Sequence, residues 1–296
     1  MYVVFDIGGS GIKIAIMSKD GEIKEKSNIS VPATYEEMLN AFCTYIDDKK
    51  NSYELKGVAI SAPGAVNHET GFIGGISAIS YIHTPTNIPL DIYKRTGLFA
   101  SIENDANCAG LGEVSFGKHQ NPSMAFVVCG SGIGGAIVRD GKIFVGKNNL
   151  GGEFGYMLVA KVDDFYKPLS SLGAVGALVH SIKEKTGEKL NGKGIFERAE
   201  QGLEPYHTEV ETMFEYLAIG LFNIQHICDP DIIVLGGAIS VREDFIPRIQ
   251  AKFEMMQQGN LMVGALPELK TCTFHNDTNL YGALANHLQG NIIKNL

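Results

Sequence analysis

The chain opens with short hydrophobic runs that are separated by glycine-containing turns. Residues 2–5 are apolar and lead into Asp6 and a group of glycines, after which apolar and polar residues alternate over 12–17. Alternation with a period of two is typical of a half-buried strand. A turn at residues 19–21 precedes a further stretch at 22–27. The pattern predicts a three-stranded antiparallel meander at the start of the chain.

The rest of the first half combines predicted helices with predicted strands. Residues 32–48 carry apolar side chains at helical spacing, whereas residues 57–61 form the short continuous apolar run of a buried strand. A short helix is expected at 91–97 and a strand at 99–103. Small residues within 106–116 predict a helix that packs closely against another helix.

The opening pattern recurs about 125 residues later. Residues 124–129 are an apolar run, 130–135 a glycine-rich loop and 136–138 a strand, and a further strand follows an Arg-Asp-Gly turn at 142–145. An internal repeat at this distance predicts two similar domains that face each other. The remaining predicted elements are helices at 172–186, 194–201, 208–228 and 245–256, a strand at 232–235 and a final helix from Asn279.

Composition narrows the class of protein. The 296 residues favour two domains. A hydrophobic content of 45% and a charged content of 20% are those of a soluble globular protein. The net charge of −8, with no cluster of Lys or Arg, argues against binding nucleic acid or an anionic membrane through phosphate contacts. Small-molecule chemistry is therefore favoured.

Cysteine usage and the first residues indicate the compartment. The five cysteines are an odd number, lie far apart and form no C-x-x-C pair, so neither a disulfide framework nor a cysteine-built zinc site is expected. The first residues lack the basic and long apolar regions of a signal peptide. No apolar run approaches the roughly 20 residues that cross a bilayer. We expect a cytoplasmic protein.

Glycine is the unusual component, at 35 residues, or about 12% against a typical usage of about 7%. The two glycine loops contain Gly8, Gly9, Ser10 and Gly11, and Gly130, Ser131, Gly132 and Gly134. Backbone N–H groups in such turns can converge on an anion, because glycine adopts positive φ and approaches phosphate closely. A lone loop of this kind is more often a tight hairpin. One loop in each repeated unit favours the binding of a polyphosphate between them.

Neither loop matches the common nucleotide motifs. The P-loop pattern G-x-x-x-x-G-K-[ST] is absent. Residues 130–135 contain G-x-G-x-x-G, but a strand rather than a helix is predicted to follow, so we reject a dinucleotide-binding function. Asp6 could bind Mg²⁺ through water, or simply accept turn N–H groups at a strand end. Lys13 could neutralise phosphate charge, or be a solvated strand lysine.

Six collinear motifs carry a resemblance to a known family. They are D-I-G-G-S-G-I-K-I-A at 6–15, S-A-P-G at 61–64, E-N-D-A-N-C-A at 103–109, G-S-G-I-G-G at 130–135, G-G-E-F-G-Y at 151–156 and D-P-x-x-I-V-L-G-G at 229–237. Together they resemble the ROK family of bacterial sugar kinases, in the actin, Hsp70 and hexokinase superfamily. The match runs in order over nearly the whole chain.

The resemblance implies an α/β fold of two ribonuclease H-like domains around a hinged cleft. The N-terminal domain would comprise residues 1–106 plus 279–296, and the C-terminal domain residues 107–278. ATP with Mg²⁺ would bind with its phosphates between the two glycine loops and its adenosine near Gly236 and Gly237. The final helix would pack on the helix at 106–116 through small residues and form the hinge.

The resemblance also implies a sugar site. Asn104, Asp105 and Glu153 would bind sugar hydroxyls, with Gly64 and Tyr156 beside them, and Asp105 would be the catalytic base. Phosphoryl transfer needs positioning, charge neutralisation and an acceptor for the hydroxyl proton. An ordinary aspartate, with a pKa of about 3.9, is already ionised at neutral pH. The alternative role for Asp105 is to cap the helix that follows it.

Two departures from the family pattern affect the expected substrate. The family's zinc-binding histidine is replaced by Tyr156, and residues 157–186 contain no cysteine, so we expect no zinc site. A glutamate that would contact the sugar near its anomeric carbon is also missing, and Ser170 or Ser171 is the nearest polar residue. We infer a site that need not hold a free anomeric hydroxyl.

The motifs are most similar to those of the β-glucoside kinases, which phosphorylate the 6-hydroxyl of cellobiose and related glucosides. Tyr156 would offer a face for the second ring, or it would merely fill the space of the lost zinc ligands. The alternatives are a monosaccharide kinase for glucose or N-acetylmannosamine, and a non-catalytic sugar-sensing regulator. With Asp6 five residues from the first residue, no helix-turn-helix domain is expected ahead of it. The family also implies a homodimer as a candidate assembly.

Overall fold

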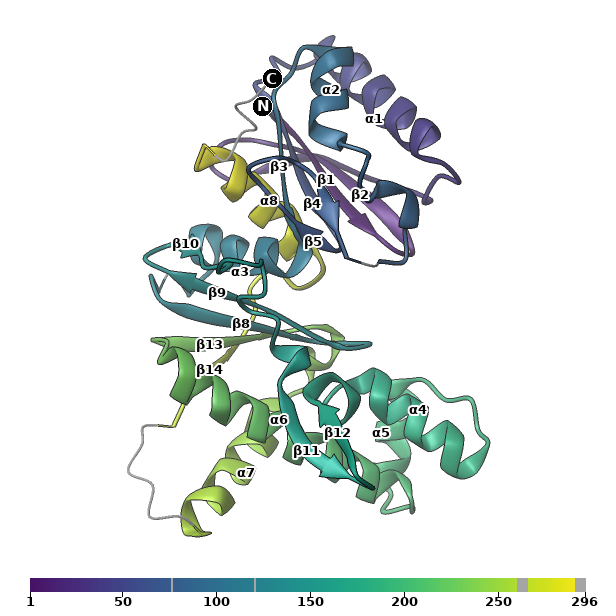
Figure 1. The fold of residues 1–296 in the computed structure, drawn as a ribbon, viewed down its shortest axis with the longest axis vertical. Coiled ribbons are helices and arrows are strands. Elements are labelled where there is room, and N and C mark those ends of the chain that lie inside the picture. The colour runs from purple at the N-terminus through teal and green to yellow at the C-terminus, as the bar shows by residue number, and fades with distance from the viewer. Residues whose placement is uncertain (76, 120, 260–265, 291–296) are drawn as a thin grey trace. The chain divides into compact units, whose positions relative to one another are not determined.

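The computed structural model describes residues 1–75, 77–119, 121–259 and 266–290 (Figure 1). The chain divides into two compact units, each of which is described by itself. The first comprises Met1–Gln120, Gly141–Asn149 and Asn276–Leu296, and the second Asn121–Asp140 and Leu150–His275. None of the described helices is long and apolar enough to cross a membrane.

The first unit is built on a five-stranded sheet with the order β3-β2-β1-β4-β7. Its strands are β1 (Tyr2–Gly8), β2 (Gly11–Met17), β3 (Ile23–Ile29), β4 (Gly57–Ala62) and β7 (Ala100–Asn104). The first three strands are antiparallel, as the alternating pattern predicted, and β4 and β7 run parallel to β1. The predicted meander is confirmed.

Helices cover both faces of this sheet (Figure 1). They are α1 (Tyr35–Lys50), α2 (Ile88–Thr96), α3 (Asp105–Phe116) and α8 (Thr278–Leu288). Successive side chains of a strand point to opposite faces. Phe5 of β1 therefore stacks on Phe42 of α1, with ring centroids 4.0 Å apart, while the neighbouring Val4 joins the cluster that contains Cys108 of α3 and Leu284 of α8. Both faces of the central strand are buried.

A small irregular segment follows β4 in the first unit. It contains β5 (Ala65–Val66), β6 (Ile73–Gly74) and the short helix η1 (Ser80–Ile82). The strands β5 and β6 pair antiparallel. The helix α2 after this segment begins at the N-cap Asn87 and ends at Gly97, which has a left-handed φ of 73°.

The second unit repeats the arrangement of strands. Its sheet has the order β10-β9-β8-β13-β14, in which β9 is antiparallel to β8 whereas β13 is parallel to β8 and to β14. The strands are β8 (Met124–Cys129), β9 (Ile133–Arg139), β10 (Lys142–Ile143), β13 (Ile232–Gly236) and β14 (Leu269–Thr271). The predicted α/β class, with two ribonuclease H-like units, is confirmed. The hinged cleft stays a prediction.

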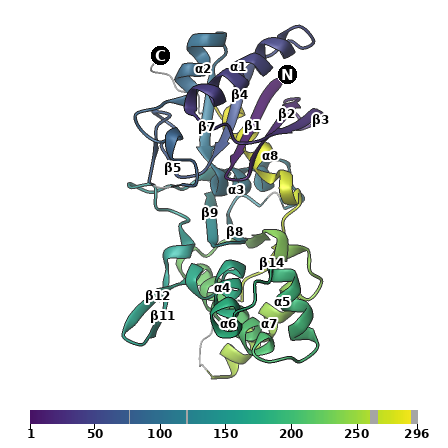
Figure 2. The ribbon, with the colours of Figure 1, turned by 90° about the vertical axis from the view of Figure 1, so that its right-hand side faces the viewer.

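Four helices pack on this second sheet around one hydrophobic core. They are α4 (Val175–Thr186), α5 (Gly192–Glu200), α6 (Tyr206–Cys228) and α7 (Phe245–Gly259). The sequence did not predict the hairpin of β11 (Leu158–Val162) and β12 (Phe165–Pro168), which projects from this unit (Figure 2). Short helical turns occur at η2 (Phe154–Tyr156), η3 (Leu169–Ser171), η4 (Ala238–Val241) and η5 (His275–Asp277).

The boundaries of the compact units differ from the domain limits predicted from the sequence. Those limits placed 107–278 in one domain and 279–296 in the other, and residues 291–296 lie outside the described part. In the structure α3 and α8 both belong to the first unit. They cross so closely that a Cβ on Gly282 would lie 1.5 Å from the carbonyl oxygen of Cys108. This crossing is packing within one unit.

Candidate functional site

The first glycine turn is a tight hairpin between β1 and β2. Gly8 pairs with Gly11, which leaves Gly9 and Ser10 as the exposed turn. None of these glycines adopts the positive φ that was expected from the sequence. Close approach is what limits them, because a Cβ on Gly8 would lie 3.1 Å from the carbonyl oxygen of Gly11, and one on Gly9 would lie 3.1 Å from Cβ of Ala78.

Asp6 is a buried carboxylate, 5% exposed, at the end of β1. Its Oδ2 accepts from Lys13 Nζ at 2.9 Å, and its Oδ1 accepts from Ser61 Oγ at 2.9 Å and from Asn279 Nδ2 at 3.1 Å. Lys13 also donates to the carbonyl oxygen of Asn276 at 2.5 Å. Lys13 is therefore an ion-pair partner of Asp6 and not a freely solvated lysine. Both carboxylate oxygens are thus engaged in hydrogen bonds, and the binding of Mg²⁺ through water at Asp6 stays a prediction.

The second glycine loop is shorter than predicted. The strand β9 begins at Ile133, so Gly134 pairs with Val128 inside the sheet and the loop is confined to residues 130–132. The predicted six-residue loop was wrong because cross-strand hydrogen bonds extend through its last three residues. Within the loop, a Cβ on Gly130 would meet nothing within 4 Å, and the φ of Gly130 is not left-handed. The protein itself does not require a glycine there.

A cavity of about 750 Å³ lies beside this loop, entirely within the second unit. It is lined by Cys129, Gly130, Ser131, Val175, Gly176, Val179, Leu190, Asn191, Gly192, Lys193, Phe196, Ala238, Ile239, Val241 and Arg242. Gly236 and Gly237 precede two of these residues directly. Gly237 has a φ of 96°, and a Cβ there would lie 2.1 Å from the carbonyl oxygen of Cys129. The second loop and the turn after β13 thus meet at one cavity.

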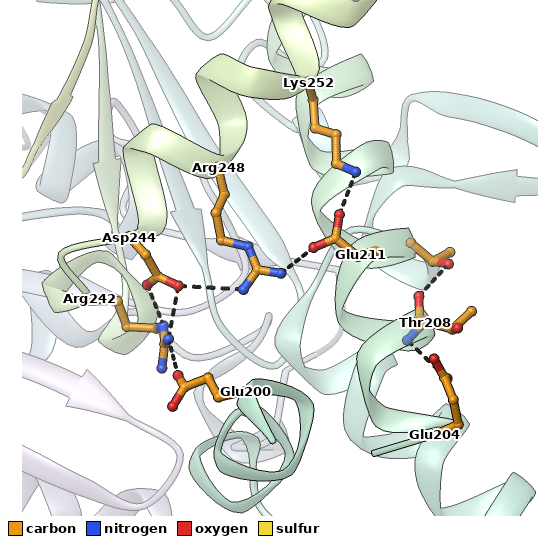
Figure 3. Close-up of polar contacts among 9 residues, drawn as sticks. Glu200, Glu204, Thr208, Glu211, Arg242, Asp244, Arg248 and Lys252 are labelled. Atoms are coloured by element: carbon orange, nitrogen blue, oxygen red, sulfur yellow. Dashed lines mark hydrogen bonds and ion pairs between the residues drawn. The ribbon is translucent and has the colours of Figure 1, made fainter. Parts of the chain in front are cut away.

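Arg242, which lines the cavity, belongs to a network of charged side chains (Figure 3). The guanidinium of Arg242 lies 4.3 Å from the ring centroid of Phe196, and it donates to Glu200 at 2.7 Å and to Asp244 at 2.9 Å. Asp244 also pairs with Arg248, at 3.4 Å. The network holds α5 and the start of α7 together next to the cavity.

Asn104, Asp105 and Gly64 lie together in the first unit, where β7 runs into α3. The N-cap of α3 is Asn104, whose Oδ1 accepts from the backbone N–H groups of Ala106 at 2.9 Å and Asn107 at 3.1 Å. Its Nδ2 donates to the carbonyl oxygen of Gly64 at 2.9 Å. The alternative role for Asp105, as the cap, is therefore taken mainly by Asn104, although Asp105 Oδ1 also accepts from Ala106 N–H at 2.8 Å.

Three carboxylates converge at this end of the first sheet. Asp6 of β1 and Glu103 of β7 both lie level with Ser61 of β4, and Asp105 follows β7 directly. Burial, and then the charges of Glu103, Asp6 and Asp105, raise the pKa of the Cys108 thiol well above its usual value. Glu103, only 1% exposed, was not among the functional residues predicted from the sequence. Its imidazole partner is His68, whose Nδ1 lies 3.1 Å from Oε2 of Glu103. The signal for Glu103 was its place inside the E-N-D-A-N-C-A motif.

The other predicted sugar ligands, Glu153 and Tyr156, belong to the second unit. Glu153 is exposed, and partial desolvation by its neighbours raises its pKa. Tyr156 is 76% exposed. Ser170 accepts from Ile133 N–H at 2.9 Å and so is tied to the backbone. The approach of these residues to a sugar held by Asp105 stays a prediction.

The sequence predicted magnesium near Asp6 and no zinc site. Over residues 1–75, 77–119, 121–259 and 266–290, no group of three His, Cys, Asp or Glu side chains that could hold a metal ion is found. The absence of zinc remains a prediction from the residues around Tyr156. Magnesium near Asp6 likewise stays a prediction, since the groups that contact this carboxylate are the donors of Lys13, Ser61 and Asn279.

The repeated sheet, with a glycine turn in each unit and a cavity beside the second, defines the actin-like ATPase class of fold. The sequence profile of the ROK family matches residues 2–289, and the chain belongs to this family. A β-glucoside kinase from Klebsiella pneumoniae is 31% identical over 290 residues, which cover 95% of this chain and 93% of that protein. The predicted family is confirmed.

Two further proteins are similar over almost their full length. An N-acetyl-D-glucosamine kinase from Histophilus somni is 28% identical over 311 residues, which cover 96% of this chain and 98% of that protein. The crystal structure of a ROK family protein from Streptococcus pneumoniae TIGR4 in complex with sucrose superposes with a TM-score of 0.89 at 38% identity, and 98% of each chain is covered.

Proposed function

We propose that the protein is an ATP-dependent sugar kinase that transfers the γ-phosphate of ATP to a sugar 6-hydroxyl, with Asp105 as the general base. The observation that carries this proposal is the start of α3. Asn104 caps the helix and is anchored to Gly64, so the carboxylate of the next residue is placed in the first helical turn at a fixed position. A carboxylate held in this way can accept the proton of an attacking hydroxyl.

The nucleotide is proposed to bind in the cavity of the second unit. Its volume of about 750 Å³ and its largely apolar helix walls suit a purine nucleoside. Gly130 and Ser131 would meet the phosphates, which explains why residue 130 lacks a side chain although the protein leaves room for one. In the first unit, the Gly9-Ser10 turn would bind the phosphates, Lys13 would neutralise part of their charge and Asp6 would hold the magnesium ion. Magnesium, bound through water near Asp6, would supply neutralisation of the phosphate charge.

The acceptor is proposed to be a β-glucoside such as cellobiose. The exposed ring of Tyr156 would offer an aromatic face to a second sugar ring, and Ser170, tied to Ile133, does not replace the glutamate that would bind near the anomeric carbon. The β-glucoside kinase relative and the sucrose complex of a similar chain both support an acceptor of disaccharide size. The alternative acceptor is a monosaccharide, N-acetylglucosamine included, which the N-acetyl-D-glucosamine kinase relative favours.

Asp105→Asn tests the proposed mechanism. Asparagine keeps the shape of the side chain but cannot take the hydroxyl proton, so we expect kcat for sugar-dependent ADP release to fall by about 10²- to 10⁴-fold. The KM for the sugar should change much less. Asp164→Asn, in the exposed turn of the β11–β12 hairpin, is the matched control and should leave kcat unchanged. ADP release by Asp105→Asn near the wild-type rate would contradict the general-base role.

A further inference from the structure

A buried carboxylate–imidazole pair, which the proposed mechanism does not use, joins the β5–β6 loop to the start of α3. Oε2 of Glu103, on β7, lies 3.1 Å from Nδ1 of His68. The side chain of Glu103 is 1% exposed and that of His68 is 27% exposed. The carboxylate accepts, so the imidazole N–H of His68 is the donor. A buried carboxylate is costly unless such partners surround it.

The other oxygen of Glu103 binds residues on both sides of Asp105. Oε1 accepts from the backbone N–H of Asn104 at 2.8 Å and from Nδ2 of Asn107 at 3.0 Å. Asn104 directly precedes Asp105, and Asn107 follows it within the same helical turn. One side chain therefore connects His68 to the backbone and side chains that flank the proposed base.

His68 is presented by a loop with its own ordering hydrogen bonds. Oδ1 of Asn67 accepts from the backbone N–H groups of Glu69 at 3.1 Å and Thr70 at 3.0 Å. Asn87, the N-cap of α2, donates to the carbonyl oxygen of Thr70 at 2.8 Å. The hydrogen bond from the imidazole therefore fixes Glu103 relative to an ordered loop.

The strength of the pair depends on the charge of His68. The hydrogen bond to Glu103 raises the pKa of His68, burial lowers it, and the charges of Glu103 and of Glu69, on the same loop, raise it further. Among the described residues, the charged groups that raise the pKa of the imidazole are these two carboxylates, Glu103 on β7 and Glu69 beside His68. The net effect favours the imidazolium.

We propose that His68 is a positioning residue for the first turn of α3, which through Glu103 fixes Asn104 and Asn107 on either side of Asp105. The kinetic consequence rests on the proposed function, whereas the structural one does not. An error of about 1 Å in the position of a base can cost about 100-fold in rate, so even a small relaxation of this turn is measurable.

Three variants separate positioning from general stability. His68→Ala should lower kcat for sugar-dependent ADP release about tenfold with the KM for ATP unchanged, and His68→Gln, which keeps a side-chain N–H, should recover part of that loss. His180→Gln removes a similar pair, His180 with Glu184 on the exposed face of α4, and should leave kcat unchanged. A kcat of His68→Ala within about twofold of the wild type would overturn the proposal.

The pH profile provides a readout that a merely structural role would not change. Because the folded-state pKa of His68 is raised above its ordinary value of about 6.5, the ion pair is complete below that pH and is lost as the pH rises through the raised pKa. The wild-type kcat should therefore decrease as the pH rises through the pKa of His68. The pH profiles of His68→Ala and His68→Gln should lack this decrease. The same decrease in His68→Ala would contradict the role of His68.

A measurement without catalysis distinguishes this proposal from the proposed function. In NMR spectra of the whole protein, His68→Ala should shift the backbone amide of Asn104 and the side-chain amide of Asn107, while His180→Gln should not. Unshifted amides would overturn the positioning role even in an active kinase. If no sugar supports ADP release by the wild type, the proposed function fails and these amide shifts alone decide the role of His68.

Discussion

Two regions of the molecule contain glycine in opposite surroundings, one closely packed and one open. Where α3 crosses α8, a Cβ on Gly282 would lie 1.5 Å from the carbonyl oxygen of Cys108, and one on Gly112 would lie 2.5 Å from that of Thr278. At Gly130, beside the cavity of the second unit, a Cβ would meet nothing within 4 Å. Protein backbone excludes a side chain from the crossing, whereas at Gly130 no protein atom does so and the proposed ATP phosphates would occupy the space. The contrast distinguishes glycines that helix packing requires from a glycine that the proposed phosphate contact would require.

The largest effect on stability is expected at the helix crossing. Gly282→Ala should lower the free energy of unfolding by more than about 3 kcal/mol or prevent folding, because α3 and α8 would have to separate. Urea denaturation measures this loss. Gly97→Ala, at the left-handed end of α2 with nothing within 4 Å, is the control and should cost about 1 kcal/mol. Equal losses in the two variants would contradict the packing argument.

A smaller effect of a different kind is expected at the loop. Gly130→Ala should leave the free energy of unfolding within about 0.5 kcal/mol of the wild type, since the added methyl group meets no protein atom. It should reduce kcat/KM for ATP about tenfold, because the methyl group would occupy the space proposed for phosphate. Steady-state kinetics at saturating sugar measure the change. Unaltered ATP kinetics would remove the case for a nucleotide at this loop.

The sequence predicted the framework of the fold because its signals are local. The period-two alternation of residues 12–17 and the recurrence of the same unit near residue 124 fix two similar sheets. The hairpin β11–β12 was missed because its exposed strands lack a clear apolar face, with Phe165 70% and Tyr166 68% exposed. The loop 130–135 was predicted too long because glycines were taken as loop residues. Gly135 is instead needed where a Cβ would lie 2.3 Å from the ring of Phe154.

The candidate site was only partly predictable. The pairing of Asp6 with Lys13 follows from a two-residue turn at Gly9-Ser10, which places them opposite each other on β1 and β2. The contact of His68 with Glu103 joins residues 35 positions apart through an irregular loop, and no periodic pattern predicts such a contact. The division of roles between Asn104 as cap and Asp105 as proposed base also needed coordinates, since either residue type can cap a helix.

The most direct test of the account is to identify the product that wild-type protein forms from ATP and a sugar. Purified protein with ATP and Mg²⁺ is given cellobiose, glucose, N-acetylglucosamine or N-acetylmannosamine in turn, and ADP and the phosphorylated sugar are followed by ³¹P and ¹³C NMR. The account predicts that cellobiose gives the highest rate, with one phosphate ester formed at a 6-hydroxyl for each ADP released. If a monosaccharide is phosphorylated rapidly while cellobiose is inert, the proposed acceptor is contradicted. Release of ADP without any phosphorylated sugar would contradict the central claim.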